Sequence, residues 1–556
     1  LTTILKLIPI RGNAMKRFTE ENSKEQFDVI IIGGGITGAA VAYEAATRGL
    51  KVALLEKKDF GWATSAATSK LIHGGLRYLA YMEIPLVRES LRERRILENI
   101  APTLVYPFPF MIPNYKRLLN NRWVLKMGMI MYDILSFDKG WTWDRSKKIP
   151  LHSQISREKA LQEEPNLKAE GLTAATIYYD CQSIFPERLT LMFIKSAVNY
   201  GAKVANYAEV KDFLYRNNSI AGVTVYDTLN NKEIDIEGKL IINCGGPWAD
   251  IILKKAENGT VKHQIRRSEG IHIITKPIVH KYAVTLMSKK GRHFFLIPWR
   301  GYSLIGTTDK EYIGNPDNYR VTRESIQELL DDVNEYFGDG TLSYNDIKYT
   351  YGGLRPLVED QVEGTYQSSR RYEIYDNAEE GVQGLITVEG GKYTTSRNLA
   401  VKVMKVVEKK LQYSLPKSIT HKQHLAGCEI KDLEAFFNTV YTSDTSFDKK
   451  SLEVLAKYFG SEIDTVIKIA GSNKKFREIV THDGEILAEV IYAIRHEMAR
   501  TLPDIVFRRT GICTAGNPGN DKLTLVAETA AKELQWDKKE LSMQLKEVKQ
   551  RLQLPK

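Results

Sequence analysis

The clearest hydrophobic pattern is an apolar run over residues 27–32 that ends in the glycines Gly33, Gly35 and Gly38. Small residues with helical spacing follow, and a second apolar run over residues 51–55 ends at Glu56. A buried strand, a glycine turn, a helix, a second strand and an acid in this order are typical of a dinucleotide-binding unit. An ordinary βαβ turn is the alternative.

The residues of this unit have distinct expected roles. Gly33 permits the tight turn, Gly35 lets the backbone approach a pyrophosphate, and Gly38 lets the helix pack on the strand. The N-terminus of the helix stabilises the phosphate charge. Glu56 can accept hydrogen bonds from a ribose diol and repel a 2′-phosphate.

Similar patterns recur later in the chain. Apolar runs end in glycine turns near residues 245 and 390, which predicts one nucleotide-binding sheet interrupted by insertions. Residues 293–299 and 302–306 alternate around a short turn, as antiparallel strands do. From about residue 418 the sequence is charged and helical, with helices expected around residues 430–439, 452–458 and 486–500.

These patterns predict an α/β protein. It combines a discontinuous Rossmann-like nucleotide-binding domain with an antiparallel-sheet substrate domain and a helical C-terminal domain. The expected boundaries are an N-terminal extension 1–26, a nucleotide-binding domain in three parts (27–105, 181–250 and 351–415), a substrate or membrane-facing insertion 106–180, an antiparallel substrate domain 251–350 and a helical domain 416–556.

Composition adds few constraints. Of 556 residues, 43% are hydrophobic and 26% charged, as in ordinary globular proteins. The four cysteines form no CxxC pair, so neither a zinc site nor a disulfide framework is expected, and no metal is predicted. Residues 1–10 are apolar but interrupted by Pro9, so we expect no signal peptide. There is no run of 18 apolar residues that would predict a spanning helix.

A net charge of +11 is compatible with nucleic acid, with an anionic membrane, or simply with a soluble surface. No zinc finger or RRM signature supports nucleic acid. Residues 115–132 mix basic residues such as Lys116, Arg117, Arg122 and Lys126 with Trp, Leu, Met and Ile side chains. This segment is predicted as an in-plane interfacial helix or as a core helix, and its periodicity fits both.

Residues 61–78 are rich in small and hydroxyl side chains. Such a run cannot build a core, but it allows backbone and hydroxyl groups to lie against a phosphate or a flat ring. The stretch also contains Trp62, His73, Arg77 and Tyr78, which are unusual in a flexible linker. We therefore interpret it as a cofactor loop.

With these motifs in hand, the sequence closely resembles the FAD-dependent glycerol-3-phosphate dehydrogenases of the aerobic type. The run AATSKLIHGGLRYL at residues 66–79 is similar to that family's signature, and the resemblance extends through residues 297–299, 305–309, 353–357 and 390–395. It implies non-covalent FAD, transfer of a hydride from C2 of sn-glycerol 3-phosphate to flavin N5, and electrons passed to a membrane quinone. It also implies a cytoplasmic protein peripherally associated with an anionic membrane surface. A homo-oligomer is compatible with the sequence.

The resemblance also implies the site residues. The cofactor set is Gly33, Gly35, Ile36, Thr37, Gly38, Glu56, Thr64, Ser65, Thr68, Ser69, Lys70, Leu71, His73, Gly74, Gly75, Gly245, Trp248, Gly353, Arg355, Gly391, Lys392 and Thr394. The substrate set is Arg77, Tyr78, His272, Arg355, Arg370 and Lys392, of which His272, Arg355 and Lys392 are also implied as catalytic.

Their individual roles follow from charge. Arg355 and Arg370 would bind the phosphate dianion, although Arg371 is adjacent to Arg370 and which of the two binds stays open. His272 would take the hydroxyl proton and Lys392 would stabilise the oxyanion, or these two roles are exchanged. From the residues alone, Arg355 or Lys392 could be a turn residue and His272 a structural histidine.

Three other functions stay open at this point. They are a glycerol-3-phosphate oxidase that uses oxygen, an amine or amino-acid oxidase of the same flavin architecture, and a non-catalytic flavin-binding membrane scaffold.

Overall fold

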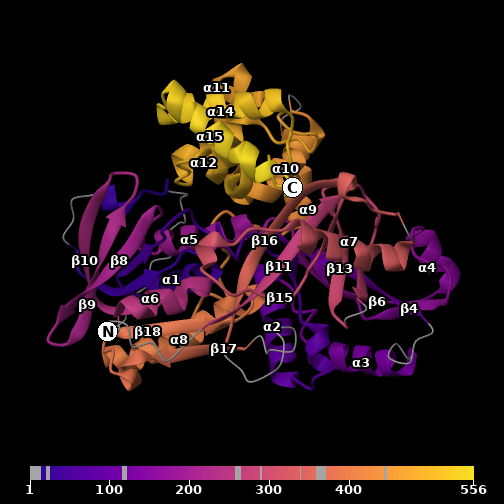
Figure 1. Ribbon diagram of the computed structural model, residues 1–556, viewed down its shortest axis with the longest axis horizontal. Coiled ribbons are helices and arrows are strands. Elements are labelled where there is room, and N and C mark those ends of the chain that lie inside the picture. The colour runs from indigo at the N-terminus through magenta and orange to yellow at the C-terminus, as the bar shows by residue number, and fades with distance from the viewer. Residues whose placement is uncertain are drawn as a thin grey trace.

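The apolar run after residue 26 forms strand β1 (Phe27–Ile32) at the centre of the first sheet (Figure 1). The computed structural model describes residues 14–20, 25–115, 122–256, 265–288, 291–338, 340–358, 371–443 and 447–556. Val29 and Ile31 belong to one hydrophobic core, and Ile30 and Ile32 to another. Burial on both faces explains why the run is continuously apolar instead of alternating.

The centre of this first sheet is parallel. Strand β1 pairs with β10 and β2, β10 pairs with β18, and β2 pairs with β7. The three predicted strand-to-glycine turns therefore do lie at one edge of one sheet. The strands of the first sheet are β1, β2 (Val52–Leu55), β7 (Lys203–Ala205), β8 (Ala208–Arg216), β9 (Ser219–Asp227), β10 (Lys232–Asn243), β17 (Tyr372–Asp376) and β18 (Leu385–Gly390).

Helices cover one face of this sheet, and the β8–β9–β10 meander with α6 covers the other. Helix α1 packs between α5 and α8, where its alanines allow close contact. The helices before the C-terminal domain are α1 (Ile36–Thr47), α2 (Ile84–Ile100), α3 (Arg122–Leu135), α4 (Arg157–Glu163), α5 (Pro186–Asn199), α6 (Ala249–Ala256), α7 (Arg323–Phe337) and α8 (Ser396–Leu411).

The second sheet is mostly antiparallel, as predicted, with one parallel pair between β12 and β4. It includes β4 and β6, from the stretch that the sequence assigned to a separate insertion, and β16, from the last nucleotide-binding part. Its strands are β3 (Leu71–Ile72), β4 (Val105–Tyr115), β5 (Ser153–Ser156), β6 (Leu172–Ser183), β11 (Arg266–Thr275), β12 (Ala283–Met287), β13 (His293–Trp299), β14 (Tyr302–Gly306), β15 (Lys310–Glu311) and β16 (Ile347–Leu357).

Alternation along β11 orients the candidate histidine. Ile271 and Ile273 pack toward α7 in one core, whereas Ile274 belongs to the core on the opposite face, with α2 and α3. Because successive strand residues point to opposite faces, His272 lies on the α2 and α3 side.

The C-terminal domain is helical, as predicted, and stands apart from α3 at the opposite side of the molecule (Figure 1). All three expected helices are present with shifted ends, as α9, α10 and α12. Its helices are α9 (Leu433–Ser443), α10 (Lys449–Phe459), α11 (Ile463–Ser472), α12 (Leu487–His496), α13 (Leu502–Asp504), the π-helix η12 (Ile505–Arg509), α14 (Asn520–Leu534) and α15 (Lys538–Leu552).

Candidate active site

A cavity of about 1050 Å³ lies between the two sheets. Its walls come from the carboxyl ends of the parallel strands, where Gly33, Glu56, Gly245 and Gly391 lie, and from the second sheet, where His272 lies. The carboxyl edge of a parallel sheet is where open α/β folds bind their ligands. The volume is at the upper end for ligand pockets, which suits a dinucleotide together with a small substrate.

The glycine turn has the geometry that the sequence predicted. Gly33 has a φ of +107°, and a Cβ atom there would lie 2.5 Å from the carbonyl oxygen of Cys244. A Cβ atom on Gly38 would lie 1.9 Å from the carbonyl oxygen of Gly33, so the helix could not pack as it does. The backbone N–H of Ile36, at the start of α1, donates to the hydroxyl of Ser65 at 2.9 Å.

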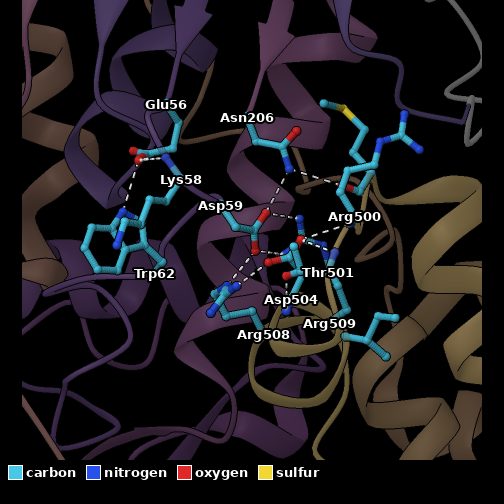
Figure 2. Close-up of polar contacts among 12 residues, drawn as sticks. Glu56, Lys58, Asp59, Trp62, Asn206, Arg500, Thr501, Asp504, Arg508 and Arg509 are labelled. Carbon is cyan, nitrogen blue, oxygen red and sulfur yellow. Dashed lines mark hydrogen bonds and ion pairs between the residues drawn. The ribbon is translucent and has the colours of Figure 1, made fainter. Parts of the chain in front are cut away.

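The Glu56 carboxylate is buried and held by three donors, of which Figure 2 shows Lys58 and Trp62. The backbone N–H groups of Gly34 and Lys58 donate to it at 2.7 and 2.9 Å, and the indole N–H of Trp62 donates at 3.0 Å. The Trp62 ring lies 5.5 Å from the ring of Trp248, and both residues line the cavity. These residues form one end of the cavity, at the tip of β2.

Two cations and a tyrosine meet at the other end. The Arg77 guanidinium donates to the Tyr78 hydroxyl at 2.8 Å, and the Lys392 ammonium lies 3.9 Å from the centre of the Tyr78 ring. The ammonium also donates to the Ser90 hydroxyl at 3.2 Å. Burial, together with the charge of nearby Arg77, lowers the pKa of Lys392 to about 8. Below that pH the group is charged and can meet an anion.

His272 lines the same cavity and is buried. Its Nε2 is 2.8 Å from the hydroxyl of Ser69, and its ring stacks on Tyr351 at 5.0 Å. Its Nδ1 is buried and has no hydrogen-bond partner among the described residues. Burial, and then the charges of Arg355 and Lys70, hold the pKa of His272 well below its usual range. The imidazole is therefore neutral near pH 7 and able to accept a proton.

Arg355 on β16 also lines the cavity. Its guanidinium donates to the carbonyl oxygens of Glu269 and Thr308 at 3.1 Å and to the hydroxyl of Thr307, and lies 3.6 Å from the Asp309 carboxylate. About a fifth of the side chain (22%) stays exposed. The group is held in place with a face directed at the cavity.

Most of the predicted residues line this one cavity. Lys70 does not, because its ammonium pairs with Glu187 at 3.2 Å and lies over the ring of Trp299. Gly38, Gly74 and Gly353 also lie behind the wall, where they allow close packing instead of forming the surface. Arg370 is outside the described residues, and Arg371 is exposed. The predicted residues on the wall are Gly33, Gly35, Ile36, Thr37, Glu56, Thr64, Ser65, Thr68, Ser69, Leu71, His73, Gly75, Arg77, Tyr78, Gly245, Trp248, His272, Arg355, Gly391, Lys392 and Thr394.

The sequence did not single out two further residues of the wall, His293 and Asp309. Burial, together with the charge of Arg77, lowers the pKa of His293 to about 4, so this imidazole is neutral as well. Asp309 accepts a hydrogen bond from Ser268 at 2.8 Å and faces Arg355. His293 begins a strand whose partner order could not be deduced locally, so its position at the site gave no sequence signal.

One arm of the cavity is apolar. Ile112, Leu125, Met129 and Leu286 belong to its lining. Helix α3 thus lines the cavity with its inner face, and its Tyr132 hydroxyl donates to Asp180 at 2.8 Å.

The outer face of α3 is apolar and exposed. Met127 is 71% and Ile134 60% exposed, and Ile130 and Met131 lie between them. One face of this helix is therefore core and the other is surface, with Leu125 half-buried, and its contact with a membrane stays a prediction. Lys116 and Arg117 lie outside the described residues. Among the helices of the described chain, none combines the length and apolar character needed to cross a bilayer.

Comparisons with known proteins agree with this geometry. Residues 28–397 match the family described as FAD dependent oxidoreductase, and residues 418–541 match the C-terminal domain of alpha-glycerophosphate oxidase. The chain is 33% identical over 545 residues to a glycerol-3-phosphate dehydrogenase of Synechocystis, covering 96% of this chain and 97% of that protein. It is 33% identical over 510 residues to the aerobic glycerol-3-phosphate dehydrogenase of Bacillus subtilis, covering 89% of each.

A solved structure is similar over nearly the whole chain. The glycerol-3-phosphate dehydrogenase from Bacillus halodurans, complexed with FAD, superposes with a TM-score of 0.76 at 28% identity. The match covers 96% of this chain and 95% of that one. The similarity therefore includes both sheets and the helical domain.

Proposed function

Because this chain belongs to the family of FAD-dependent glycerol-3-phosphate dehydrogenases, we propose that it oxidises sn-glycerol 3-phosphate to dihydroxyacetone phosphate and passes the electrons to a membrane quinone. The observation that carries the proposal is that Arg77, Arg355 and Lys392 line the same cavity as a neutral histidine, His272. Several cations suit a phosphate dianion, and a neutral imidazole suits removal of a hydroxyl proton.

FAD fits the observed walls. The turn at Gly33 and Gly35 and the N-terminus of α1 would hold its pyrophosphate, and Glu56 would hold the adenosine ribose. The buried, unpartnered Nδ1 of His272 is a polar atom that a bound cofactor or substrate could satisfy. When bound, FAD supplies the acceptor for the hydride that leaves C2 of the substrate.

The residues of the chain would bind and orient the substrate. Arg355 would bind the phosphate, with Arg370 or Arg371 as a second cation, and Arg77 and Tyr78 would complete that end of the site. His272 would accept the C2 hydroxyl proton, and protonated Lys392 would stabilise the developing oxyanion.

An anaerobic bleaching assay tests this function. Glycerol 3-phosphate should bleach the flavin absorbance of the purified protein, whereas free glycerol, which lacks the dianion, should be a very poor reductant. A panel of amines and amino acids is the control, because an amine or amino-acid oxidase needs an arginine for a carboxylate and not several cations. Bleaching by an amino acid and not by glycerol 3-phosphate would overturn the proposal.

A lipophilic electron acceptor is supported by the apolar arm. Leu125 and Met129 line the cavity from the same helix that exposes Met127 and Ile134. An apolar arm beside an apolar surface suits a quinone dissolved in a bilayer. Under air, turnover without added quinone and with stoichiometric hydrogen peroxide would instead support the oxidase alternative.

We further propose that the outer face of α3 touches an anionic membrane on the cytoplasmic side. Exposed basic residues, Lys126, Arg145 and Lys148, accompany the exposed apolar ones. Apolar side chains can enter the acyl boundary while nearby cations meet anionic headgroups.

A further inference from the structure

The π-helix η12 (Ile505–Arg509) in the C-terminal domain connects to both ends of the cavity without lining it. π-Helical turns are rare and frequently occur at functional sites. Its consecutive side chains Phe507, Arg508 and Arg509 all reach out of their own domain. The segment has no role in the function proposed above.

The two arginines hold one buried carboxylate, Asp59 (Figure 2). Arg509 donates to both Asp59 oxygens, at 2.8 and 2.7 Å, and Arg508 Nε donates at 2.5 Å. The Asn206 side chain adds a hydrogen bond at 3.1 Å. Burial alone would raise the pKa of Asp59, but Arg509 and Arg508 outweigh it and hold the pKa at about 2.

Asp59 is the centre of the loop at the adenosine end of the cavity. On one side of it the Lys58 N–H donates to Glu56, and on the other the Trp62 indole does so. The same loop contacts the phosphate turn, because the Gly61 N–H donates to the Gly34 carbonyl at 3.0 Å. The position of Asp59 therefore fixes Glu56 and Trp62, which form the cavity wall.

Phe507 leads to the other end of the cavity through a column of rings. Its ring stacks on Tyr349 at 6.0 Å, Tyr349 lies 6.2 Å from Tyr351, and Tyr351 stacks on His272 at 5.0 Å. Tyr351 is fixed in turn, because its hydroxyl donates to the Thr68 carbonyl at 2.8 Å. The ring of His272 thus rests on a stack that begins in the C-terminal domain.

We propose that η12 is a positioning element for the active site: Arg508 and Arg509 place the adenosine loop through Asp59, and Phe507 places His272 through Tyr349 and Tyr351. The inference rests on the proposed FAD-dependent function. It assigns the helical domain a role in holding the cofactor and the base in register, and the residues of η12 act through other side chains.

The same domain provides a matched control. Arg300, in the turn between β13 and β14, donates to Asp483 at 2.6 Å, to Glu485 and to the Gly511 carbonyl at 2.8 Å. We call such a buried group of arginine and carboxylate side chains a clamp. The clamp of Arg300 is buried and ionic like that of Asp59, but Arg300 does not line the cavity. Removing the Arg300 guanidinium should destabilise the helical domain without moving the adenosine loop, the loop of residues 56–62 around Asp59.

The first experiment measures the FAD dissociation constant of apoprotein. Arg509→Met should raise it by about tenfold or more, since small displacements of a binding wall cost this much. Arg509→Lys keeps the charge but not the two-pronged geometry, and should give a smaller rise and a protein that folds even if the methionine variant does not. Arg300→Met should lower the unfolding temperature and leave the FAD dissociation constant unchanged. An unchanged FAD dissociation constant in both Arg509 variants, or the same rise in Arg300→Met, would overturn the proposed role of the η12 arginines.

The second experiment measures the rate of flavin bleaching by glycerol 3-phosphate at saturating FAD. Phe507→Leu should slow it by about tenfold with the FAD dissociation constant unchanged, whereas Phe507→Tyr, which keeps the ring, should restore it. A wild-type bleaching rate in Phe507→Leu would overturn the proposed role of Phe507 in placing His272. If the wild type is not bleached at all, the proposed substrate fails, and the FAD titrations still test the role of the η12 arginines.

Discussion

At the scale of single residues, the local environment divides the two candidate proton-transfer groups. His272 has a pKa well below 6.5 and Lys392 a pKa of about 8, so near pH 7 the first is neutral and the second charged. This difference supports the proposed roles, with His272 as the base and Lys392 as the electrostatic group, and it can be tested by pH.

We expect kcat/KM to fall as pH rises through about 8, because Lys392 then loses the charge that stabilises the oxyanion. The phosphate does not interfere, since its second pKa is near 6. In Lys392→Arg the guanidinium stays charged, so the alkaline fall should disappear. If Lys392 were the base, activity would instead rise through pH 8 and the arginine variant would be inactive.

Arg355→Leu should raise KM for glycerol 3-phosphate and leave flavin content unchanged. Loss of a charge-assisted contact typically costs about 1.5 to 3 kcal/mol, roughly tenfold to a hundredfold in affinity. Arg266→Leu is the control, because Arg266 is on the neighbouring strand β11 and pairs with the exposed Glu311 outside the cavity. Unchanged kinetics in Arg355→Leu would mean that Arg355 does not bind the phosphate and only holds Thr307 and Thr308 in place through its hydrogen bonds.

The sequence predicts a residue's place in the site poorly where the partner of its side chain is distant in the chain. Gly33 and Gly38 could be assigned because their constraint is local, within one strand–turn–helix unit. Lys70 lies in an equally clear motif, but it pairs with Glu187, more than a hundred residues away, and so points away from the cavity. Asp59 gave no signal for the same reason, since its two arginine partners lie in another domain.

At the scale of elements, the hydrophobic pattern predicted where strands lie better than it predicted which strands pair with each other. The strands at residues 293–299 and 302–306 match β13 and β14. The pairing of β4 with β12 and of β16 with β11 depends on contacts between distant segments, so no local pattern could place β4, β6 and β16 in one sheet. The same limit applies to α3. Its periodicity predicts one apolar face, but only contacts with distant segments determine which face is buried and which is exposed.

Helix α3 should anchor the protein to anionic liposomes. Met127→Asp combined with Ile134→Asp puts charges on the apolar outer face and should abolish sedimentation with liposomes at low salt, because burying a charge in the acyl boundary is unfavourable. Flavin bleaching by substrate should persist. Added salt should weaken binding of the unaltered protein by screening the basic residues.

Ile313→Asp is the matched control for the liposome experiment. Ile313 is 92% exposed and follows β15 in the second sheet, so this change adds a charge at an exposed apolar position outside α3. It should leave sedimentation unchanged. Equal loss of binding in both proteins would mean that net charge, and not the face of α3, determines membrane binding.

At the scale of the whole molecule, buried arginine clamps join the helical domain to both sheets. Arg188 of α5 pairs with Glu497 at 2.8 Å, Arg300 pairs with Glu485, and Arg509 pairs with Asp59 at 2.7 Å. A buried pair gives little net stability over apolar packing, but removing one partner is strongly destabilising. The clamps therefore fix how the domain sits on the cavity more than how stable each part is.

The clamp at Asp59 should give a distinctive dependence of stability on pH. The folded-state pKa of Asp59, about 2, is below the ordinary value of 3.8, so its contribution is complete above pH 3.8 and is lost as pH falls through 2. The size of this contribution is about 2 kcal/mol. Asp59→Asn removes the buried carboxylate that Arg508 and Arg509 share, although Arg508 keeps its ion pair with Asp504. It should lower stability at pH 7 by about 3 to 5 kcal/mol, seen as a lower unfolding temperature. Between pH 3.8 and 2 the gap between the two proteins should narrow, which unfolding scans across that range would measure. A gap that stays constant down to pH 2 would mean that Asp59 does not carry the charge on which the clamp depends.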